Sequence, residues 1–190
     1  MNEAAPLEEK TKTFSDFVRF ALIATAIVLP IRFFVAQPFI VSGTSMVPTF
    51  DNAHYLIIDE LTYRLGEPKR GEVIVFKFPL ESAKYLIKRV IGLPEETVII
   101  KDNSVTIKNS AHPDGFLLDQ PGIAASVRSA DQAVTLESNE YFVLGDNRDA
   151  SSDSRIWGPL KRELIIGRPL LRLYPPSKIG LFPGEWSAQE

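Results

Sequence analysis

The chain has 190 residues and no cysteine, which excludes disulfide bonds, a thiolate nucleophile and thiolate metal ligands. Its only histidines are His54 and His112, and they do not have the spacing of a metal-binding pair. A histidine-based catalytic triad would need a serine and a carboxylate oriented around the ring. The sequence contains no pattern that points to one, so neither cysteine nor histidine chemistry is expected.

An excess of basic charge is also lacking. The chain has 21 Lys and Arg against 24 Asp and Glu, a net charge of -3 and a pI near 5.5. Nucleic-acid binding depends on clustered Lys and Arg that neutralise phosphates. No nucleic-acid partner is therefore expected. With 45% hydrophobic residues, the length favours one main domain with at most one appendage.

A mostly apolar segment runs from Phe17 to Val41, and its uninterrupted centre is Phe20–Leu29. That centre alone is too short to cross a bilayer, because a spanning helix needs about 20 residues. Phe33–Ala36 must therefore contribute, with Arg32 reaching the interface. The alternatives are a buried helix and a cleaved signal peptide, but Phe33–Pro38 is a poor cleavage site. We expect an uncleaved transmembrane anchor.

The basic residues around this segment predict its orientation. Lys10, Lys12 and Arg19 precede or open it, whereas the next basic residue after Arg32 is Arg64. The excess of positive charge on the N-terminal side predicts a cytoplasmic N-terminus. We therefore expect a cytoplasmic tail at 1–13, an anchor helix at 14–36 and an extracytoplasmic β-rich catalytic domain at 37–190.

The region after the anchor has the pattern of a mainly β fold. Short runs rich in β-branched and aromatic residues alternate with Gly, Pro, Asn and Asp turns, and no helical periodicity of ten residues interrupts them. The expected strands are Tyr55–Ile58, Val73–Phe78, Tyr85–Ile87, Thr97–Ile100, Ser104–Ile107 and Tyr141–Leu144. Ile165–Tyr174 is expected to be the last strand, and Ser110–Glu140 a surface excursion. This pattern favours an antiparallel sheet.

Ser45 and Lys88 are the candidates for chemistry. A serine hydroxyl needs a neighbouring base before it is a good nucleophile, and lysine is the base that remains. Lys88 is flanked by apolar residues, so burial would lower its pKa from the reference of about 10.4. Lys88 and Arg89 face opposite sides of a strand, so one can be buried while the other is solvated. The alternative is that both are solvated charges at a strand edge.

The stretch Gly145–Arg155 is a third notable cluster. It has the composition of a turn, but Asp146, Arg148, Asp149, Asp153 and Arg155 make it rich in charges that can pair. Its serines could form hydrogen bonds to an adjacent buried amine. Such a loop could orient a catalytic residue.

Four stretches together resemble the ordered motifs of type I signal peptidases, the membrane-bound Ser-Lys endopeptidases. They are Ser42–Thr49, Arg70–Phe76, Tyr85–Pro94 and Gly145–Arg155, and they stand in the family's order behind an N-terminal anchor. The resemblance covers about Gln37 to Pro159, apart from the Ser110–Glu140 stretch.

The resemblance assigns roles to individual residues. It implies that Ser45 is the nucleophile, that Lys88 is the general base and that the Ser151 hydroxyl bonds the lysine. Asp153 and Arg155 correspond to a supporting charge pair.

The resemblance also concerns the oxyanion hole and the substrate pockets. The Ser45 amide would be one oxyanion donor, while Gly43 stands where some members have a serine that supplies the second. Four residues match those that line shallow pockets for small side chains, although core packing is the alternative for each: Phe39, Val41, Met46 and Ile87.

The implied function is removal of N-terminal signal peptides from exported preproteins, with a cut after Ala-x-Ala-like residues through an acyl-enzyme. The implied fold is the signal peptidase/LexA-like β fold at the bacterial cytoplasmic membrane, with the catalytic domain on the outer, periplasmic face. Membrane lipid is an expected contact, and no metal or organic cofactor is implied.

Two other functions stay open at this point. One is a membrane-tethered, non-catalytic β domain that binds an envelope partner. The other is a LexA-like Ser-Lys protein that cleaves itself, although the acidic balance and the apolar segment count against it. A penicillin-binding Ser-x-x-Lys site is excluded because Pro48 occupies the lysine position.

Overall fold

The computed structural model describes residues 14–26, 36–102, 104–120 and 131–185 of the chain. The chain separates into two compact units, 1–36 and 37–190. In the first unit, residues 14–26 form a helix that leaves Phe14, Phe17 and Phe20 about 70% exposed. No helix within the described residues has both the length and the apolar character needed to cross a membrane. The predicted tail and residues 27–35 of the predicted anchor lie outside the described residues.

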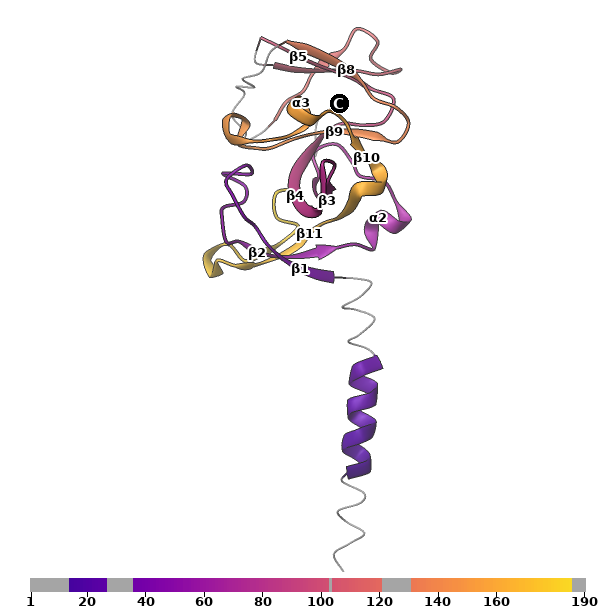
Figure 1. The fold of residues 1–190 in the computed structure, drawn as a ribbon, viewed down its shortest axis with the longest axis vertical. Coiled ribbons are helices and arrows are strands. Elements are labelled where there is room, and N and C mark those ends of the chain that lie inside the picture. The colour runs from indigo at the N-terminus through magenta and orange to yellow at the C-terminus, as the bar shows by residue number, and fades with distance from the viewer. Residues whose placement is uncertain (1–13, 27–35, 103, 121–130, 186–190) are drawn as a thin grey trace, which may run out of the picture. The chain divides into compact units, whose positions relative to one another are not determined.

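The second unit consists mainly of antiparallel sheet (Figure 1). Among the described residues, the larger sheet has the order β1-β2-β11-β3-β4-β9-β10, with β12 paired to β11. Its strands are β1 (Ala36–Ile40), β2 (Tyr55–Asp59), β3 (Val73–Phe78), β4 (Glu81–Gly92), β9 (Glu140–Leu144), β10 (Leu160–Lys161), β11 (Ile165–Tyr174) and β12 (Gly180–Leu181). The prediction of a mainly β, antiparallel fold is confirmed.

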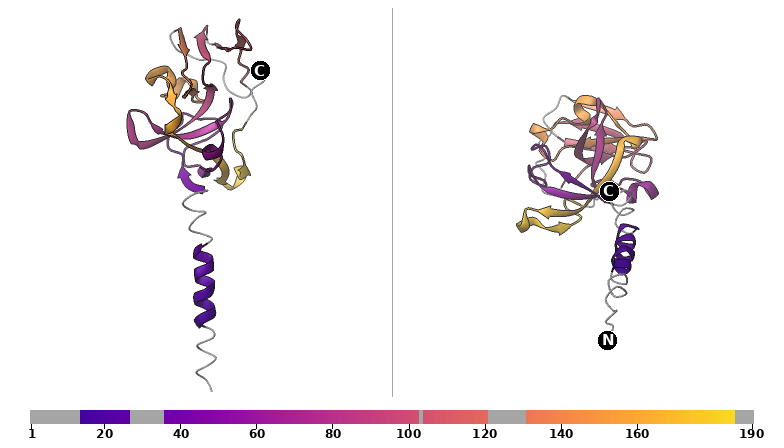
Figure 2. Two further views of the ribbon diagram at one scale, coloured as in Figure 1. Left: turned by 90° about the vertical axis from the view of Figure 1, so that its right-hand side faces the viewer. Right: turned by 60° about the horizontal axis from the view of Figure 1, so that its bottom comes forward.

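A smaller sheet has the order β7-β6-β5-β8. Its strands are β5 (Thr97–Lys101), β6 (Ser104–Lys108), β7 (Phe116–Leu117) and β8 (Gln132–Thr135). Figures 1 and 2 show it at the end of the unit opposite β1, β2 and β11. The short helices α2 (Thr62–Leu65) and α3 (Ser154–Trp157) and the 3-10 turns η1 (Arg148–Ala150), η2 (Arg162–Leu164) and η3 (Pro176–Lys178) lie in the connections.

Side-chain alternation explains the small sheet. In β5 and β6 every second residue is buried, so Val98, Ile100, Val105 and Ile107 lie on one face. That face packs on side chains of the larger sheet, among them Phe142 of β9. Strand β3, in contrast, is buried at four successive positions, as expected of a strand covered on both faces.

Two of the sequence expectations need correction. Ser110–Glu140 is not simply a surface excursion, because it contributes β7 and β8, and Leu118 and Leu136 are buried in the core; residues 121–130 lie outside the described residues. Ile165–Tyr174 is a strand as predicted, but not the last one, since β12 folds back on β11. Both features depend on long-range pairing, which local composition does not encode.

Strand β4 is longer than the Tyr85–Ile87 run predicted from the sequence. It extends over Glu81–Gly92, with an exposed first half and a buried second half. The buried half pairs with β3 on one side and β9 on the other. Strand β4 therefore places Lys88 and Arg89 in the interior of the unit.

Candidate active site

Ser45 lies in the turn that follows β1, and hydrogen bonds hold this turn from two sides. The backbone N–H of Asn147 donates to the Ser45 carbonyl at 3.0 Å, and the Asn147 side-chain amide donates to the Thr44 carbonyl at 3.1 Å. On the other side, the Gly43 N–H donates to Asn52 Oδ1 at 3.0 Å. Gly43 has a φ of +100°, a backbone conformation that favours glycine. The turn is thus held on one side by Asn147, 103 positions from Thr44, and on the other by Asn52, 9 positions from Gly43.

Strand β4 brings the Lys88 amine to the Ser45 hydroxyl. Lys88 Nζ lies 2.7 Å from Ser45 Oγ and also donates to the Ile87 carbonyl at 2.8 Å. Only 2% of Lys88 is exposed. A hydroxyl and an amine at this distance have the geometry that a nucleophile and its general base require.

Burial lowers the pKa of Lys88 to about 8, because an ammonium loses its hydration inside the protein. Asp153 and Asp146 act in the opposite direction, since their negative charges favour the ammonium, while Lys84 adds to the lowering. Among the described residues, Lys88 has no ion-pair partner. With a pKa of about 8, roughly a tenth to a quarter of the amine is neutral between pH 7 and 7.5 and can accept a proton.

The Gly145–Arg155 cluster lies directly beside these two residues. Arg155 forms a two-pronged ion pair with Asp153, with Nε to Oδ1 at 2.7 Å and Nη2 to Oδ2 at 2.8 Å. Asp153 is fully buried and also accepts a hydrogen bond from the Gly145 N–H at 3.0 Å. The structure therefore forms the predicted charge pair and ties it to Gly145.

Ser151 packs against the same glycine. A Cβ on Gly145 would lie 2.2 Å from Ser151 Oγ and 2.5 Å from the Ser45 carbonyl oxygen, so glycine permits this close approach. The Ser151 Oγ is buried and has no hydrogen-bond partner within the described part of the chain. The bond to Lys88 that the resemblance implies is thus not formed in this structure.

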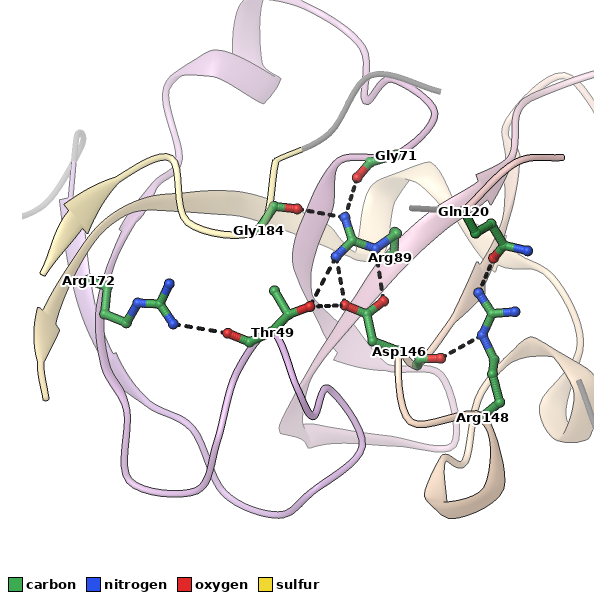
Figure 3. A network of polar contacts seen from close by, with 9 residues as sticks. Thr49, Gly71, Arg89, Gln120, Asp146, Arg148, Arg172 and Gly184 are labelled. Carbon is green, nitrogen blue, oxygen red and sulfur yellow. Dashed lines mark hydrogen bonds and ion pairs between the residues drawn. The ribbon is translucent and has the colours of Figure 1, made fainter. Parts of the chain in front are cut away.

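Arg89 is buried as completely as Lys88, so neither arrangement considered from the sequence, one side chain solvated or both, is found. Its exposed fraction is 1%, and its guanidinium pairs with Asp146, with Nε to Oδ1 at 2.8 Å and Nη2 to Oδ2 at 2.6 Å (Figure 3). Asp146 Oδ2 also accepts from the Thr49 hydroxyl at 2.5 Å. Strand alternation does point the two side chains apart, but β4 lies inside the unit and both directions lead into protein.

An apolar cleft opens beside Ser45 and Lys88. It has a volume of about 110 Å³, and its lining includes Phe39, Val41 and Ile87. Met46 was expected in the same group, but it is 1% exposed and belongs to the core cluster with Val41 and Leu56. Because Val41 and Leu56 also line the cleft, Met46 belongs to the core that supports it.

Sequence reasoning missed several residues that build this site. Asn52 and Asn147 hold the turn from Gly43 to Phe50 that carries Ser45, here called the nucleophile turn. Thr49, within this turn, bonds Asp146, and the Arg89–Asp146 pair lies behind it. The only local signal was the density of charges after Gly145. Partners more than fifty positions apart could not be matched from that density alone.

A family model described as "Signal peptidase, peptidase S26" matches residues 14–174. The chain belongs to this signal peptidase family. The sequence-based identification of a signal peptidase, a serine endopeptidase, is thereby confirmed. The match covers the helix of the first unit as well as the residues that surround Ser45 and Lys88.

Individual relatives agree with the family model. A probable signal peptidase I-2 of Synechocystis sp. is 35% identical over 89% of this chain and 77% of the relative. A signal peptidase I of Leptolyngbya laminosa is 34% identical over 93% of this chain and 84% of the relative. The crystal structure of a signal peptidase I from Enterococcus faecalis aligns with a TM-score of 0.46 and 31% identity, covering 54% of this chain and 97% of that chain.

Proposed function

We propose that this signal peptidase cleaves signal peptides from exported preproteins with Ser45 as nucleophile and Lys88 as general base. The observation that carries the proposal is the 2.7 Å contact between Lys88 Nζ and Ser45 Oγ, made by an amine whose burial lowers its pKa to about 8. A lysine with its ordinary pKa would be almost fully protonated at neutral pH and could not take the hydroxyl proton.

The reaction begins when neutral Lys88 accepts the Ser45 proton and Oγ attacks the scissile carbonyl carbon. The tetrahedral intermediate collapses as the peptide C–N bond breaks, and the Lys88 ammonium returns its proton to the leaving amine. Lys88, neutral again, then takes a proton from water, whose oxygen attacks the acyl-enzyme. Collapse of the second intermediate returns the proton to Ser45 Oγ and releases the signal peptide with a free carboxyl group.

The backbone N–H of Ser45 is the proposed oxyanion donor. Its position is fixed because the Ser45 carbonyl is held by Asn147 and the preceding Thr44 carbonyl by the Asn147 side chain. A donor held in this way need not reorganise as charge develops on the carbonyl oxygen. Gly43 has no hydroxyl, so it offers no side-chain donor to the oxyanion.

The cleft beside Ser45 is the proposed site for the substrate residues before the cut. Its lining by Phe39, Val41 and Ile87 is apolar and belongs to or packs on the buried core, so the cleft resists widening for a large side chain. Specificity for Ala-x-Ala-like sequences follows, because a bulky side chain would have to displace well-packed residues. Met46 contributes by keeping the floor of the cleft rigid.

The first unit is proposed as a membrane anchor spanning 14–36, with the tail 1–13 in the cytoplasm and 37–190 on the periplasmic face of a bacterial membrane. The exposed apolar side chains of the helix at 14–26 and the basic residues Lys10, Lys12 and Arg19 support this arrangement. Contact with membrane lipid would bring the site close to a translocated signal peptide.

The dyad is tested by cleavage of a purified preprotein in detergent. Ser45→Ala and Lys88→Ala should each lower the cleavage rate by about 10³-fold or more, because each removes a group that takes part in bond making. Ser82→Ala and Lys77→Ala are the matched controls, since both residues are exposed and lie on β4 and β3. Wild-type rates in both site variants would refute the dyad.

A further inference from the structure

We infer that Gly184, in the C-terminal turn (Phe182–Glu185), is a positioning residue for the Ser45 nucleophile. The inference rests on the proposed dyad and concerns how the chain keeps Ser45 in place. It is drawn from a segment outside the four motif stretches and more than 130 residues after Ser45 in the chain.

The C-terminal turn is anchored on β11. After β12, the Phe182 N–H donates to the Leu170 carbonyl at 2.8 Å, and the Arg168 guanidinium lies over the Phe182 ring at 5.3 Å. The Glu185 N–H donates back to the Phe182 carbonyl at 3.3 Å and closes the turn. These contacts give the turn a definite position before it reaches the site.

From this position, the Gly184 carbonyl points at the buried guanidinium of Arg89 (Figure 3). Arg89 Nη1 donates to the Gly184 carbonyl at 2.6 Å and to the Gly71 carbonyl at 2.7 Å, while Nε and Nη2 donate to Asp146. A guanidinium has five N–H groups, and leaving one unpaired in the interior is unfavourable. The Gly184 carbonyl thus helps to hold Arg89 in its orientation toward Asp146.

Asp146 connects Arg89 to the nucleophile turn. Its Oδ2 accepts from the Thr49 hydroxyl at 2.5 Å, and the next residue, Asn147, donates its N–H to the Ser45 carbonyl at 3.0 Å. The turn that begins at Ser45 is therefore held at both ends by the pair Asp146–Asn147. A shift of Arg89 or Thr49 would be transmitted to Ser45 through one or two hydrogen bonds.

Gly184 also contacts the nucleophile turn directly, and no other residue type fits there. Its φ is +81°, and an added Cβ would lie 2.6 Å from Thr49 Cγ2 and 3.0 Å from Phe50 Cε2. Thr49 cannot rotate its methyl away without breaking the hydroxyl bond to Asp146. A larger residue at this position must therefore displace the turn that carries Ser45.

The test compares Gly184→Ala with Gly180→Ala in the full chain. We expect Gly184→Ala to lower kcat by between about tenfold and a hundredfold, the range associated with small displacements of a catalytic group, and to leave KM nearly unchanged because it does not touch the cleft. Gly180→Ala should keep the wild-type kcat, since a Cβ there meets no atom within 4 Å. Rates are normalised to the folded fraction measured by near-UV circular dichroism.

Two further variants separate positioning from general strain. Gly158→Ala reproduces the strain of a positive φ, +87°, in open space, and should lower kcat far less than Gly184→Ala. Thr49→Ser retains the hydroxyl but removes the methyl, so the double variant Thr49→Ser/Gly184→Ala should recover most of the kcat relative to Thr49→Ser alone. If Gly184→Ala does not fold, the comparison with Gly180→Ala is made in the Thr49→Ser background.

Wild-type kcat per folded molecule in Gly184→Ala would overturn the inference. A loss that Thr49→Ser does not relieve, or that Gly158→Ala matches, would overturn it as well. Cleavage by Ser45→Ala at the wild-type rate would instead refute the proposed dyad, so the two failures are distinguishable.

Discussion

Lys88 and Arg89 are adjacent, equally buried basic residues on β4, and the protein surrounds them in opposite ways. Lys88 lies against a hydroxyl and a carbonyl, without an ion-pair partner in the part of the chain that the structure describes. Arg89 donates hydrogen bonds to Asp146 and to the carbonyls of Gly71 and Gly184. One strand therefore carries the proposed general base on one face and a structural ion pair on the other.

The difference follows from the chemistry of the two side chains. A guanidinium remains protonated in the interior, so its burial requires a carboxylate and several carbonyl acceptors. A lysine amine can release its proton, so burial without a partner yields a neutral base instead of an unstable charge. The proposed mechanism needs both: the arginine to hold the turn that carries Ser45 and the lysine to take the proton.

The strongest way to break this contrast is Lys88→Arg, which places a permanent cation beside Ser45. We expect cleavage to fall by about 10²- to 10⁴-fold, because the guanidinium cannot serve as a general base near neutral pH. The single-turnover cleavage rate of a preprotein measures this loss. Lys77→Arg, on the exposed part of β3, should retain the wild-type rate. A Lys88→Arg enzyme with more than about a tenth of the wild-type rate would contradict the role of Lys88.

Removing the partner of Arg89 should instead damage the fold. Asp146→Asn leaves a buried guanidinium without its compensating charge, and we expect the free energy of unfolding to fall by about 3 to 5 kcal/mol. Urea unfolding monitored by near-UV circular dichroism measures the change. Asp114→Asn, at an exposed position, is the matched control and should be nearly neutral. An equal, small effect of both variants would mean that the Arg89–Asp146 pair is not needed for stability.

Lys88 should also make the reaction depend on pH. The Lys88 pKa of about 8 predicts that kcat/KM falls as the pH drops below that value, approaching tenfold per unit, because only the neutral amine accepts the Ser45 proton. At higher pH the amine stays neutral and the acid-side dependence disappears. The pH profile of kcat/KM measures this, and a rate independent of pH throughout the acidic range would be incompatible with Lys88 as the base.

The smallest expected effect concerns Lys84, which stands on the exposed half of β4. Its positive charge helps to lower the pKa of Lys88, so Lys84→Gln should raise that pKa and move the acid limb of the profile to higher pH. Lys77→Gln removes a positive charge from the neighbouring strand β3 and is the matched control, because Lys77 is not among the groups that shift the pKa of Lys88. A shift in the opposite direction, or an equal shift in both variants, would show that Lys84 does not act on Lys88.

Much of the fold could be predicted from local pattern. Val73–Phe78 and Ile165–Tyr174 were predicted with the bounds that the structure gives. The first is rich in β-branched and aromatic residues and the second is ended by Pro175 and Pro176, and both signals are local. The small strands β7 and β8 were not predicted, because they are two and four residues long and form only through pairing with β6 and β5.

For the candidate site too, local signals predicted some features and long-range contacts decided the others. Residue type and motif order were enough to single out Ser45, Lys88, Asp153 and Arg155, and the structure brings them together. Met46 was placed in the cleft but lies in the core, because the direction of a side chain in an irregular turn depends on the turn's own geometry. The partner of Arg89 was not predicted, because several acidic residues after Gly145 were equally plausible.

By itself, the sequence determined which chemistry is available: with no cysteine and no suitable histidine, a serine and a lysine among apolar neighbours were the groups left for a nucleophile and its base. Only the tertiary structure decided how these groups are positioned. Arg89 pairs with Asp146, and the Asn147 N–H donates to the Ser45 carbonyl. The Gly184 carbonyl, near the C-terminal end of the described residues, accepts a hydrogen bond from Arg89. The physical reason is the distance along the chain over which each effect acts. The identity of a residue and the periodicity around it are local properties. Hydrogen bonds across the interior join segments far apart in the chain, and no periodic pattern shows which segments will meet.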